Sequence, residues 1–321
     1  MQYSLPKRAK QHGMAIISAL LIAAVVAVMA AGMLTRQSVL TRSLEAEQAR
    51  QQGAAVLLGG LETSRQLLWD ARRQQASTRL DQAWAQPIYS GLAQAGFAGR
   101  LEDQQGKFNL RNLIAGERVN ARELRSFERL CAMLGIDAGV AQRISQRVIS
   151  AYPQQLSSQG AAQNRYDSGR STSPGANAKP LPATRPMLRS LDDLRGIKGV
   201  NERVLARLTP HVSIIPVSTG VNGNTASAEV LAAVVPELSL PQAQALVAER
   251  DRGQWFINRG DFLNRLRAPH LSVDDLDVGI TSEWFLLRGY ARRDTRRVSL
   301  DALLYRREND LPKVIWSRLG L

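Results

Sequence analysis

Cysteine and histidine are scarce in this chain of 321 residues. It has one cysteine, Cys131, and three histidines, His12, His211 and His270, which lie far apart in the sequence. A single cysteine cannot close an intramolecular disulfide, so the fold must rest on packing alone. One cysteine and three scattered histidines also exclude the ligand spacings of structural zinc sites.

The motifs of common enzyme classes are missing as well. The sequence has no GxSxG, no HExxH and no phosphate-binding glycine loop. His211 lies in the apolar stretch HVSIIP, where a structural role is expected. We therefore predict that the protein is not an enzyme.

Acidic residues are too few to balance the basic ones. The chain has 42 Lys and Arg against 28 Asp and Glu, a formal net charge of +14. The arginines are spread along the whole chain, with one local run at Arg292, Arg293, Arg296 and Arg297. Such a charge suits a nucleic acid, an anionic membrane surface or an acidic protein as partner. A solvated basic surface is the simplest interpretation.

Charge is absent from one long segment near the amino terminus. Residues 14–34 read MAIISALLIAAVVAVMAAGML, 21 residues without a charged side chain. At about 1.5 Å per residue, such a helix matches a hydrocarbon core of about 30 Å. The 13 residues before it include Lys7, Arg8 and Lys10 and no acid. This pattern predicts a single membrane span with the leader in the cytoplasm and the bulk of the chain on the other side.

Three kinds of processing fit this segment. A secretory signal would be cut among Ala27 to Gly32, but the apolar cores of signals usually run about 7–15 residues, and this one is longer. A plain anchor would stay uncut. The third kind is a cut between Gly13 and Met14, where the polar leader ends abruptly, which would leave the apolar helix intact.

The helix is predicted to continue beyond the apolar run. Residues 35–75 contain no proline and are rich in good helix formers. Gly53, Gly59 and Gly60 predict a kink in this part. Apolar residues at helical spacing predict an amphipathic half that packs on a globular head. These residues are Leu40, Leu44, Val56, Leu57, Leu61 and Leu68.

The middle of the chain is predicted to be mainly helical. Residues 97–110 suggest a hairpin around a turn at 103–106. Asn120 is a candidate cap of a helix whose apolar face includes Cys131, and a second helix is expected around 140–149. Residues 153–186 are rich in Pro, Gly, Ser, Asn and Gln and predict a mobile loop.

Two pairs of similar segments within the sequence help to define a helical domain. FNLRNL near position 110 is echoed by VNGNT at 221–225. LDDLRGIKGVNERVLARL at 191–208 is echoed more faintly by GDFLNRLRAPHLSVDDL at 260–276. Each of the first pair precedes amphipathic helices, so we predict one helical domain from about 111 to 277.

The period of the pattern changes to two after Gly279. Alternating apolar residues predict antiparallel strands around 284–291 and 298–304, with ARRDTRR as the turn and PKVIWSRL as a third strand. The predicted fold class is α+β: a long N-terminal helix on a small antiparallel sheet, with a large inserted all-helical domain. The predicted division of the chain is 1–13 (leader), 14–34 (apolar half-helix), 35–110 (amphipathic half-helix and first part of the head), 111–277 (inserted domain) and 278–321 (C-terminal strands).

Several segments, in the same order along the chain, resemble one family. They are the leader junction HGMAIISALLIAAVVAVMA, GKFNLRNL, SLDDLRGIKGV, GVNGNTASAEVLAAV and the C-terminal strands. Together they resemble the type II secretion minor pseudopilins of the general secretion pathway protein K family, and the leader resembles the class III leader of type IV pilins. The resemblance spans nearly the whole chain. It implies a pilin-like fold with a helical domain inserted into its sheet region.

The resemblance also implies how the amino terminus is processed. Prepilin peptidase would cut between Gly13 and Met14 and methylate the new amine of Met14. Ser18, the fifth residue after that cut, stands where most such proteins carry glutamate. That carboxylate is thought to neutralise the free amine of a neighbouring subunit, because an unpaired charge is costly in an apolar bundle. A subunit with nothing above it has no amine to neutralise, so Ser18 suggests a position at the filament tip.

Partners and location follow from the same resemblance. It implies a complex with the minor pseudopilins I and J on a shaft of the main pseudopilin G, after processing by prepilin peptidase, with secreted substrates as further candidates. The protein would be a single-pass protein of the bacterial inner membrane with a periplasmic head. Its role would be to help initiate pseudopilus assembly and protein export across the outer membrane.

Calcium binding is known in some members of that family, but this sequence offers few ligands for it. Calcium takes six to eight oxygen ligands, usually with several carboxylates. The segment after Tyr152 supplies only Asp167, and Asp103 sits in the predicted turn without acidic neighbours. Asp192 and Asp193 are expected to cap a helix. No cofactor is predicted and no metal site is assigned.

DNA binding is the alternative function. LDDLRGIKGVNERVLARL resembles a helix-hairpin-helix, in which the amides of a glycine-bearing hairpin bind a phosphate. Here the second glycine position is Lys198, and Gly199 comes one residue late. Helical pairs of this kind also serve as protein-packing units. A periplasmic head would meet little nucleic acid, so a DNA-binding membrane protein is the less favoured interpretation.

Overall fold

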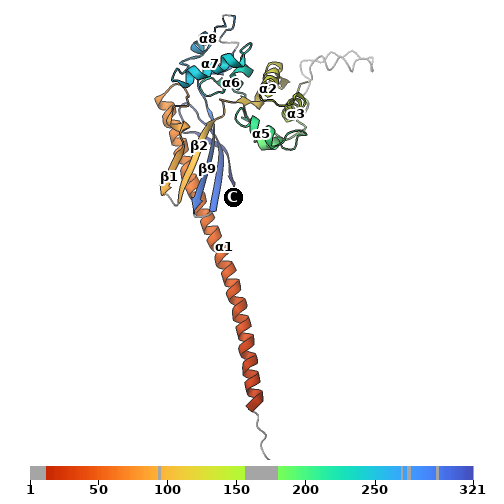
Figure 1. The fold of residues 1–321 in the computed structure, drawn as a ribbon, viewed down its shortest axis with the longest axis vertical. Coiled ribbons are helices and arrows are strands. Elements are labelled where there is room, and N and C mark those ends of the chain that lie inside the picture. Colours follow the sequence, from red (N-terminus) through yellow and green to blue (C-terminus); the bar gives the residue numbers. More distant parts are fainter. Residues whose placement is uncertain are drawn as a thin grey trace, which may run out of the picture.

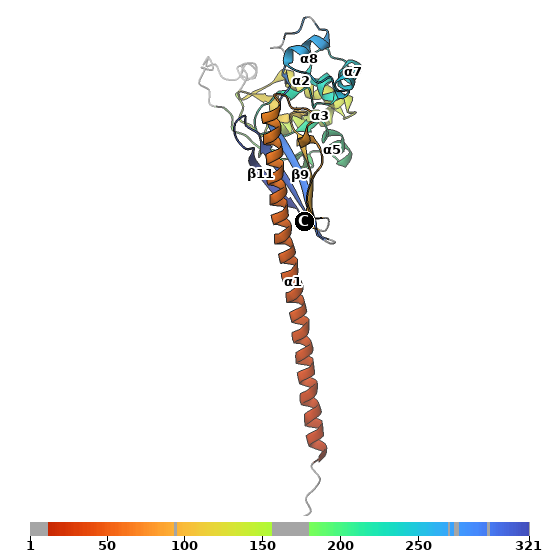
Figure 2. The same cartoon turned by 90° about the vertical axis from the view of Figure 1, so that its left-hand side faces the viewer.

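A single long helix dominates the molecule. The computed structural model describes residues 12–92, 95–155, 180–268, 270–272, 276–293 and 296–320. Helix α1 (His12–Gln74) runs without interruption for 63 residues, about 95 Å at 1.5 Å per residue. Figure 1 and Figure 2 show its first part extending far below a head that is built around its last part.

The head contains one five-stranded sheet that packs on α1. Its strand order is β1-β2-β9-β10-β11, and every neighbouring pair is antiparallel. The strands are β1 (Ile88–Leu92), β2 (Ala95–Asp103), β9 (Trp284–Arg293), β10 (Arg296–Tyr305) and β11 (Lys313–Gly320). The three C-terminal strands are thus confirmed, and with them the predicted α+β fold class.

The core between α1 and the sheet is formed by apolar residues at helical spacing in α1 and by alternate residues in the strands. Leu57, Leu61 and Leu68 of α1 are buried, as expected for one stripe of a helix. From the sheet, alternate residues of β9 and β10 are buried against them. They are Phe285, Leu287, Ala291, Leu300, Ala302 and Leu304.

A second, larger unit is inserted into the sheet. Strands β2 and β9 are neighbours in register, with Asp103 opposite Phe285, so the whole segment between them leaves and re-enters the sheet at one end. The predicted limits of the helical domain, 111 and 277, lie inside this segment. Its helices are α2 (Ala121–Met133), α3 (Ala138–Ile149), α5 (Glu202–Leu208), α6 (Ala228–Val234), α7 (Leu240–Asp251) and α8 (Arg259–Leu266). They share a core of their own.

The repeated patterns FNLRNL and VNGNT mark the beginnings of two units within this insertion, each closed by a pair of strands. Strand β3 (Phe108–Asn109) pairs in parallel with β6 (Val212–Ser213), and β7 (Val221–Asn222) pairs in parallel with β8 (Val278–Gly279). FNLRNL therefore begins with β3, and VNGNT lies at β7. In each unit, helices lie between a first and a last strand, and these two strands pair with each other. The remaining short elements of the described residues are η1 (Ala83–Ala85), η2 (Leu110–Leu113), β4 (Ile114–Ala115), β5 (Arg118–Val119) and η4 (Leu191–Leu194).

Three local predictions are wrong. The hairpin around 103–106 does not form, because β2 pairs with β1 and β9 while β3 pairs with β6. Leu40 and Leu44 are 59% and 70% exposed, since the sheet does not reach that far down the helix (Figure 1). The expected kink is absent: α1 is one continuous helix through all three glycines, and both views show it without a sharp bend (Figure 1 and Figure 2).

Other local predictions are confirmed. The Asn120 side chain accepts hydrogen bonds from the first turn of α2, and Cys131 is buried. The Asp193 carboxylate accepts hydrogen bonds from the backbone of Arg189 and Ser190, which makes it a cap. Most of the loop predicted at 153–186, with Asp167, lies outside the described residues, as does the centre of the ARRDTRR turn.

Candidate functional site

The first part of α1, residues 16–44, has an apolar surface that no other part of the described chain covers. We call it the stem. Its large apolar side chains between Ile16 and Leu44 are 46–76% exposed. An 18-residue window of the helix has a mean hydropathy of 2.6 with none of it buried, and the helix is long and apolar enough to cross a membrane. A contiguous apolar surface of this size requires lipid or other apolar helices around it.

The residues predicted for processing lie at the far end of the stem. Gly13 and Met14 are in the first turn of α1, and Ser18 is an exposed residue of the next turn. The leader residues before His12 lie outside the described part of the chain. The structure therefore brings these three residues together through helix geometry alone, far from the head (Figure 1).

A ring inserted between glycines allows the head to sit close to α1. Phe97 of β2 is 2% exposed. A Cβ added at Gly60, Gly99 or Gly289 would lie 2.3, 2.5 and 2.3 Å from atoms of the Phe97 ring. These distances are far below van der Waals contact, so the ring occupies space that only glycine leaves open. Gly60 thus serves close packing of the helix on the sheet, not bending.

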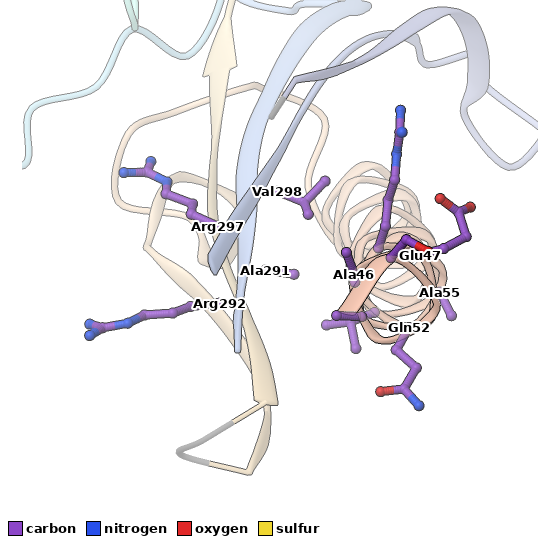
Figure 3. A pocket seen from close by; sticks show the side chains of 13 residues that line it. Ala46, Glu47, Gln52, Ala55, Ala291, Arg292, Arg297 and Val298 are labelled. Atoms are coloured by element: carbon purple, nitrogen blue, oxygen red, sulfur yellow. The ribbon is translucent and has the colours of Figure 1, made fainter. Parts of the chain in front are cut away.

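A groove opens where α1 leaves the sheet. It has a volume of about 800 Å³ and lies between α1 and the lower ends of β9 and β10. Figure 3 shows Ala291 and Val298 pointing toward the helix, while Arg292 and Arg297 point away from it. Ala46 of α1 lines the same groove. The alternation along β9 and β10 thus separates an apolar face toward α1 from a basic face on the other side.

A buried carboxylate joins the sheet to the inserted unit. Asp103, at the end of β2, is 7% exposed. Its carboxylate accepts hydrogen bonds from Ser282 Oγ at 2.6 Å, Thr225 Oγ1 at 2.5 Å and Asn222 Nδ2 at 3.2 Å. The backbone N–H of Gln105 donates to it at 2.8 Å. Burial raises the pKa of Asp103, and the hydrogen bonds from Ser282, Thr225 and Gln105, with the charge of Arg306, oppose that rise.

Arg306 supplies a buried positive charge next to these polar groups around Asp103. It is 3% exposed, and its Nη2 donates to Thr78 Oγ1 at 2.7 Å and to the carbonyl of Ser282 at 2.6 Å. Its guanidinium carbon lies 4.7 Å from the centre of the Phe285 ring. Burial lowers the pKa of Arg306 to about 10, and the charge of Asp103 opposes that fall. We call Asp103, Asn222, Thr225, Ser282 and Arg306 the junction cluster.

The junction cluster was not predicted from the sequence. Asp103 was expected in an exposed turn, whereas it is the shared acceptor of donors more than 100 positions away. The available signals were Asn222 in GVNGNT and an arginine directly after an apolar strand, Arg306. Neither signal shows which residues Asn222 and Arg306 contact, because those contacts form only in the folded chain. Among the described residues, no three His, Cys, Asp or Glu side chains gather as they would around a metal ion.

The hairpin that resembles a DNA-binding motif packs against the protein. Gly199 has φ +91°, and an added Cβ there would lie 2.8 Å from Val140 of α3. Arg143 of the same helix donates to the carbonyl of Lys198 at 2.7 Å. The hairpin between η4 and α5 is therefore held against α3, which matches its interpretation as a packing unit.

Comparison with known proteins points to one family. Two family models, both described as type II secretion system protein K, match residues 106–217 and 221–281, together more than half of the chain. These ranges correspond to the unit closed by β3 and β6 and the unit closed by β7 and β8. None of these matches favours the DNA-binding alternative.

Similar full-length proteins and a similar structure are also known. The type II secretion system protein K of Pseudomonas aeruginosa is 29% identical, over 98% of this chain and 94% of that protein. The protein of the same name from Pectobacterium carotovorum is 29% identical over 88% of both. A chain of the crystal structure of the GspK-GspI-GspJ complex from enterotoxigenic Escherichia coli has a TM-score of 0.62 at 18% identity, over 86% of this chain and 99% of that one. This last likeness concerns the fold.

Proposed function

The chain belongs to the type II secretion system protein K family, and from this premise we propose that it is the tip subunit of a pseudopilus. As a minor pseudopilin it belongs to a family of secretion-system components that are not known enzymes. It would be held in the inner membrane by its stem, with the head in the periplasm. There it would help to initiate pseudopilus assembly and the export of proteins across the outer membrane.

The bare stem is the observation that carries the proposal. A head with a complete core sits on a helix whose first half has no apolar partner in the chain's described residues. Before assembly, lipid would cover the stem, and in a filament the stems of neighbouring subunits would replace it. The same helix can serve both states because it carries no charge between Met14 and Leu34.

Two features support a place at the tip. Ser18 cannot provide the carboxylate that would pair with the amine of a subunit above it. The inserted unit lies at the end of the sheet opposite the stem (Figure 1), where it would obstruct a subunit stacking on top. The chain would therefore be drawn outward as further subunits add below it.

Partners are proposed from the relative's complex. The similar chain comes from a structure whose title names GspK, GspI and GspJ. By that likeness we propose minor pseudopilins I and J as direct partners, a shaft of main pseudopilin G below them, and prepilin peptidase as the processing enzyme. Coexpression of the full chain with I and J, followed by affinity purification of the complex from membranes, tests the first two partners.

Mass spectrometry of the mature amino terminus tests the proposal most directly. We expect a chain that begins at methylated Met14. An uncut Met1, or a start beyond Ala30, would contradict the proposed processing. Gly13→Leu should block the cut, whereas Gly32→Leu, the same exchange inside the apolar run, should not.

The tip position has its own test. Ser18→Glu restores the carboxylate that shaft subunits carry, and a labelled copy should then enter the shaft or disturb the order of assembly. Ser38→Glu, on an exposed part of the same helix outside the apolar run, is the matched control. If Ser18→Glu leaves the order unchanged and the unmodified protein is already found along the shaft, the tip position is wrong.

A further inference from the structure

A second groove lies on the face of the sheet that is turned away from α1. Leu286 and Arg288 of β9 line it, and they alternate with Phe285 and Leu287, which are buried against α1. The groove is formed where η4 and β6 of the inserted unit meet this face, and its volume is about 360 Å³. We call it the outer groove, and the proposed function does not use it.

The outer groove combines apolar side chains with an excess of positive charge. The sheet contributes Leu286, Leu303 and Trp316 to its lining. Four basic and two acidic residues line it as well. They are Lys107, Arg189, Arg288 and Arg318, against Asp192 and Asp301. Apolar walls with a few charged groups are typical of a binding site, and here the charge favours an anion.

Both acids of the outer groove already have arginine partners. Arg318 Nη2 lies 3.1 Å from an Asp301 carboxylate oxygen, and Arg195 Nη2 lies 3.0 Å from one of Asp192. Arg189 is exposed, and its guanidinium forms no hydrogen bond or ion pair with any residue that the structure describes. The positive charge of Arg189 is therefore available to a ligand.

Like charges also lie close together at the inner end of the groove. The Lys107 side chain is 12% exposed, and its Nζ lies 3.1 Å from Glu102 Oε2. Burial lowers the pKa of Lys107, the charge of Glu102 opposes that fall, and the charge of Arg288 adds to it. Arg288 has only a long ion pair, 3.8 Å from Nη1 to Glu102 Oε1. An anion in the groove would reduce the repulsion between these two cations.

One buried hydroxyl beside the groove is not satisfied. Ser213 of β6 lines the outer groove and is 2% exposed. Its Oγ has no hydrogen-bond partner among the described residues. A buried hydroxyl without a partner is unfavourable, so a polar ligand group in this groove would have a further contact to gain.

Strand β11 borders the outer groove and is the edge of the sheet (Figure 2). Trp316 and Arg318 of this strand line the groove. The outward backbone groups of β11 form no backbone hydrogen bond within the described part of the chain. Val314, Ile315 and Leu319 are 39%, 43% and 57% exposed. An open edge with exposed apolar side chains can accept a further strand from another chain.

We propose that an extended acidic segment of a partner protein adds to β11 as a sixth strand and places a carboxylate in the outer groove beside Arg189. An added strand would lie about 4.8 Å from β11, and every second side chain would lie on the same face as Arg318. The excess of positive charge favours an acidic segment over a basic one, and the open edge favours a peptide over a small anion. This interaction surface goes beyond the proposed function and does not depend on a position at the tip.

Fluorescence anisotropy with the full chain in detergent tests this proposal. The probe is a fluorescein-labelled hexapeptide of alternating valine and glutamate. One matched probe has glutamine in place of glutamate, and another has methylated backbone amides, which cannot donate to a strand. We expect each matched probe to bind roughly tenfold more weakly. Equal binding of the glutamine probe would contradict the need for a carboxylate, and equal binding of the methylated probe would contradict strand addition.

Variants separate the outer groove from the basic surface as a whole. Arg189→Gln/Arg318→Gln should weaken binding of the glutamate probe roughly tenfold, and Arg189→Lys/Arg318→Lys should retain most of it. Arg203→Gln/Arg252→Gln removes two exposed arginines of the inserted unit and should bind like the unmodified chain. Equal losses in the two glutamine variants would show unspecific attraction to a basic protein and overturn the proposal.

Hydrogen–deuterium exchange locates the bound peptide. A saturating concentration of the glutamate probe should slow the exchange of amides in β11, residues 313–320. Strand β1, the other edge of the sheet, is the internal control and should exchange at an unchanged rate. Protection of β1 instead of β11, or of neither strand, would overturn the proposed docking site.

Discussion

Ser282 donates its hydroxyl to Asp103 at 2.6 Å, although 179 positions separate the two residues. Asp103 is the last residue of β2, where the chain leaves the sheet, and Ser282 lies two residues before β9, where it returns. Asn222 donates to both of them from the inserted unit. The two parts of the head are thus joined by a buried polar cluster, whose directional hydrogen bonds fix how the inserted unit sits on the sheet.

Removing the Ser282 hydroxyl should weaken this joint. Ser282→Ala deletes one donor to a buried carboxylate and one acceptor for Asn222. Hydrogen bonds to charged groups contribute about 1.5–3 kcal/mol each, and we expect a loss of unfolding free energy in that range. Urea unfolding of the full chain in detergent, followed by tryptophan fluorescence, measures it. Ser43→Ala, which removes an exposed hydroxyl of α1, should change the free energy by less than about 0.5 kcal/mol.

Two adjacent glycines of α1 should respond to alanine with opposite signs. Gly60→Ala places a methyl group 2.3 Å from the Phe97 ring, whereas an added Cβ at Gly59 meets nothing within 4 Å. Overpacking costs about 1–3 kcal/mol, while alanine is favoured over glycine in a helix by about 1 kcal/mol. We therefore expect Gly60→Ala to lower the unfolding midpoint and Gly59→Ala to raise it. Equal effects of the two substitutions would show that Phe97 does not restrict the approach of α1 to the sheet.

Local patterns predicted the elements of this fold better than their pairing. The apolar run from Met14 to Leu34 and the alternation in β9 and β10 each reflect the environment of one element, so they can be read directly. The false hairpin at 103–106 arose because a turn-like segment between two short strands does not reveal that the chain inserts about 180 residues before the sheet resumes.

The residues predicted for processing and the junction cluster differ in the same way. Gly13, Met14 and Ser18 could be proposed from the sequence because they lie close together at one leader junction, whose pattern resembles that of a known family. Asp103, Asn222 and Arg306 come together only through the folded topology, and a lone aspartate or arginine in a sequence does not reveal that it is buried. Gly60 was misinterpreted for a related reason, since its role depends on Phe97, which lies in another element.

The single cysteine gives a prediction about alkaline stability. Cys131 is 1% exposed within the core of the inserted unit. Burial, with a smaller contribution from Glu128, raises the pKa of the Cys131 thiol from 9.0 to about 12. The folded state therefore keeps this proton over a range in which the unfolded state releases it. The resulting stability is fully present below pH 9 and is lost as the pH rises toward 12.

Comparison with Cys131→Ala isolates this effect from other groups that titrate at high pH. Between pH 8 and pH 11 the unmodified chain should lose about 2–3 kcal/mol more unfolding free energy than the variant. Urea unfolding at several pH values in the same detergent measures both curves. Cys131→Ala is expected to be somewhat less stable at pH 8, because it removes buried volume, but its curve should be flatter. Parallel curves would mean that the thiol can release its proton in the folded protein, and that the core around α2 admits water.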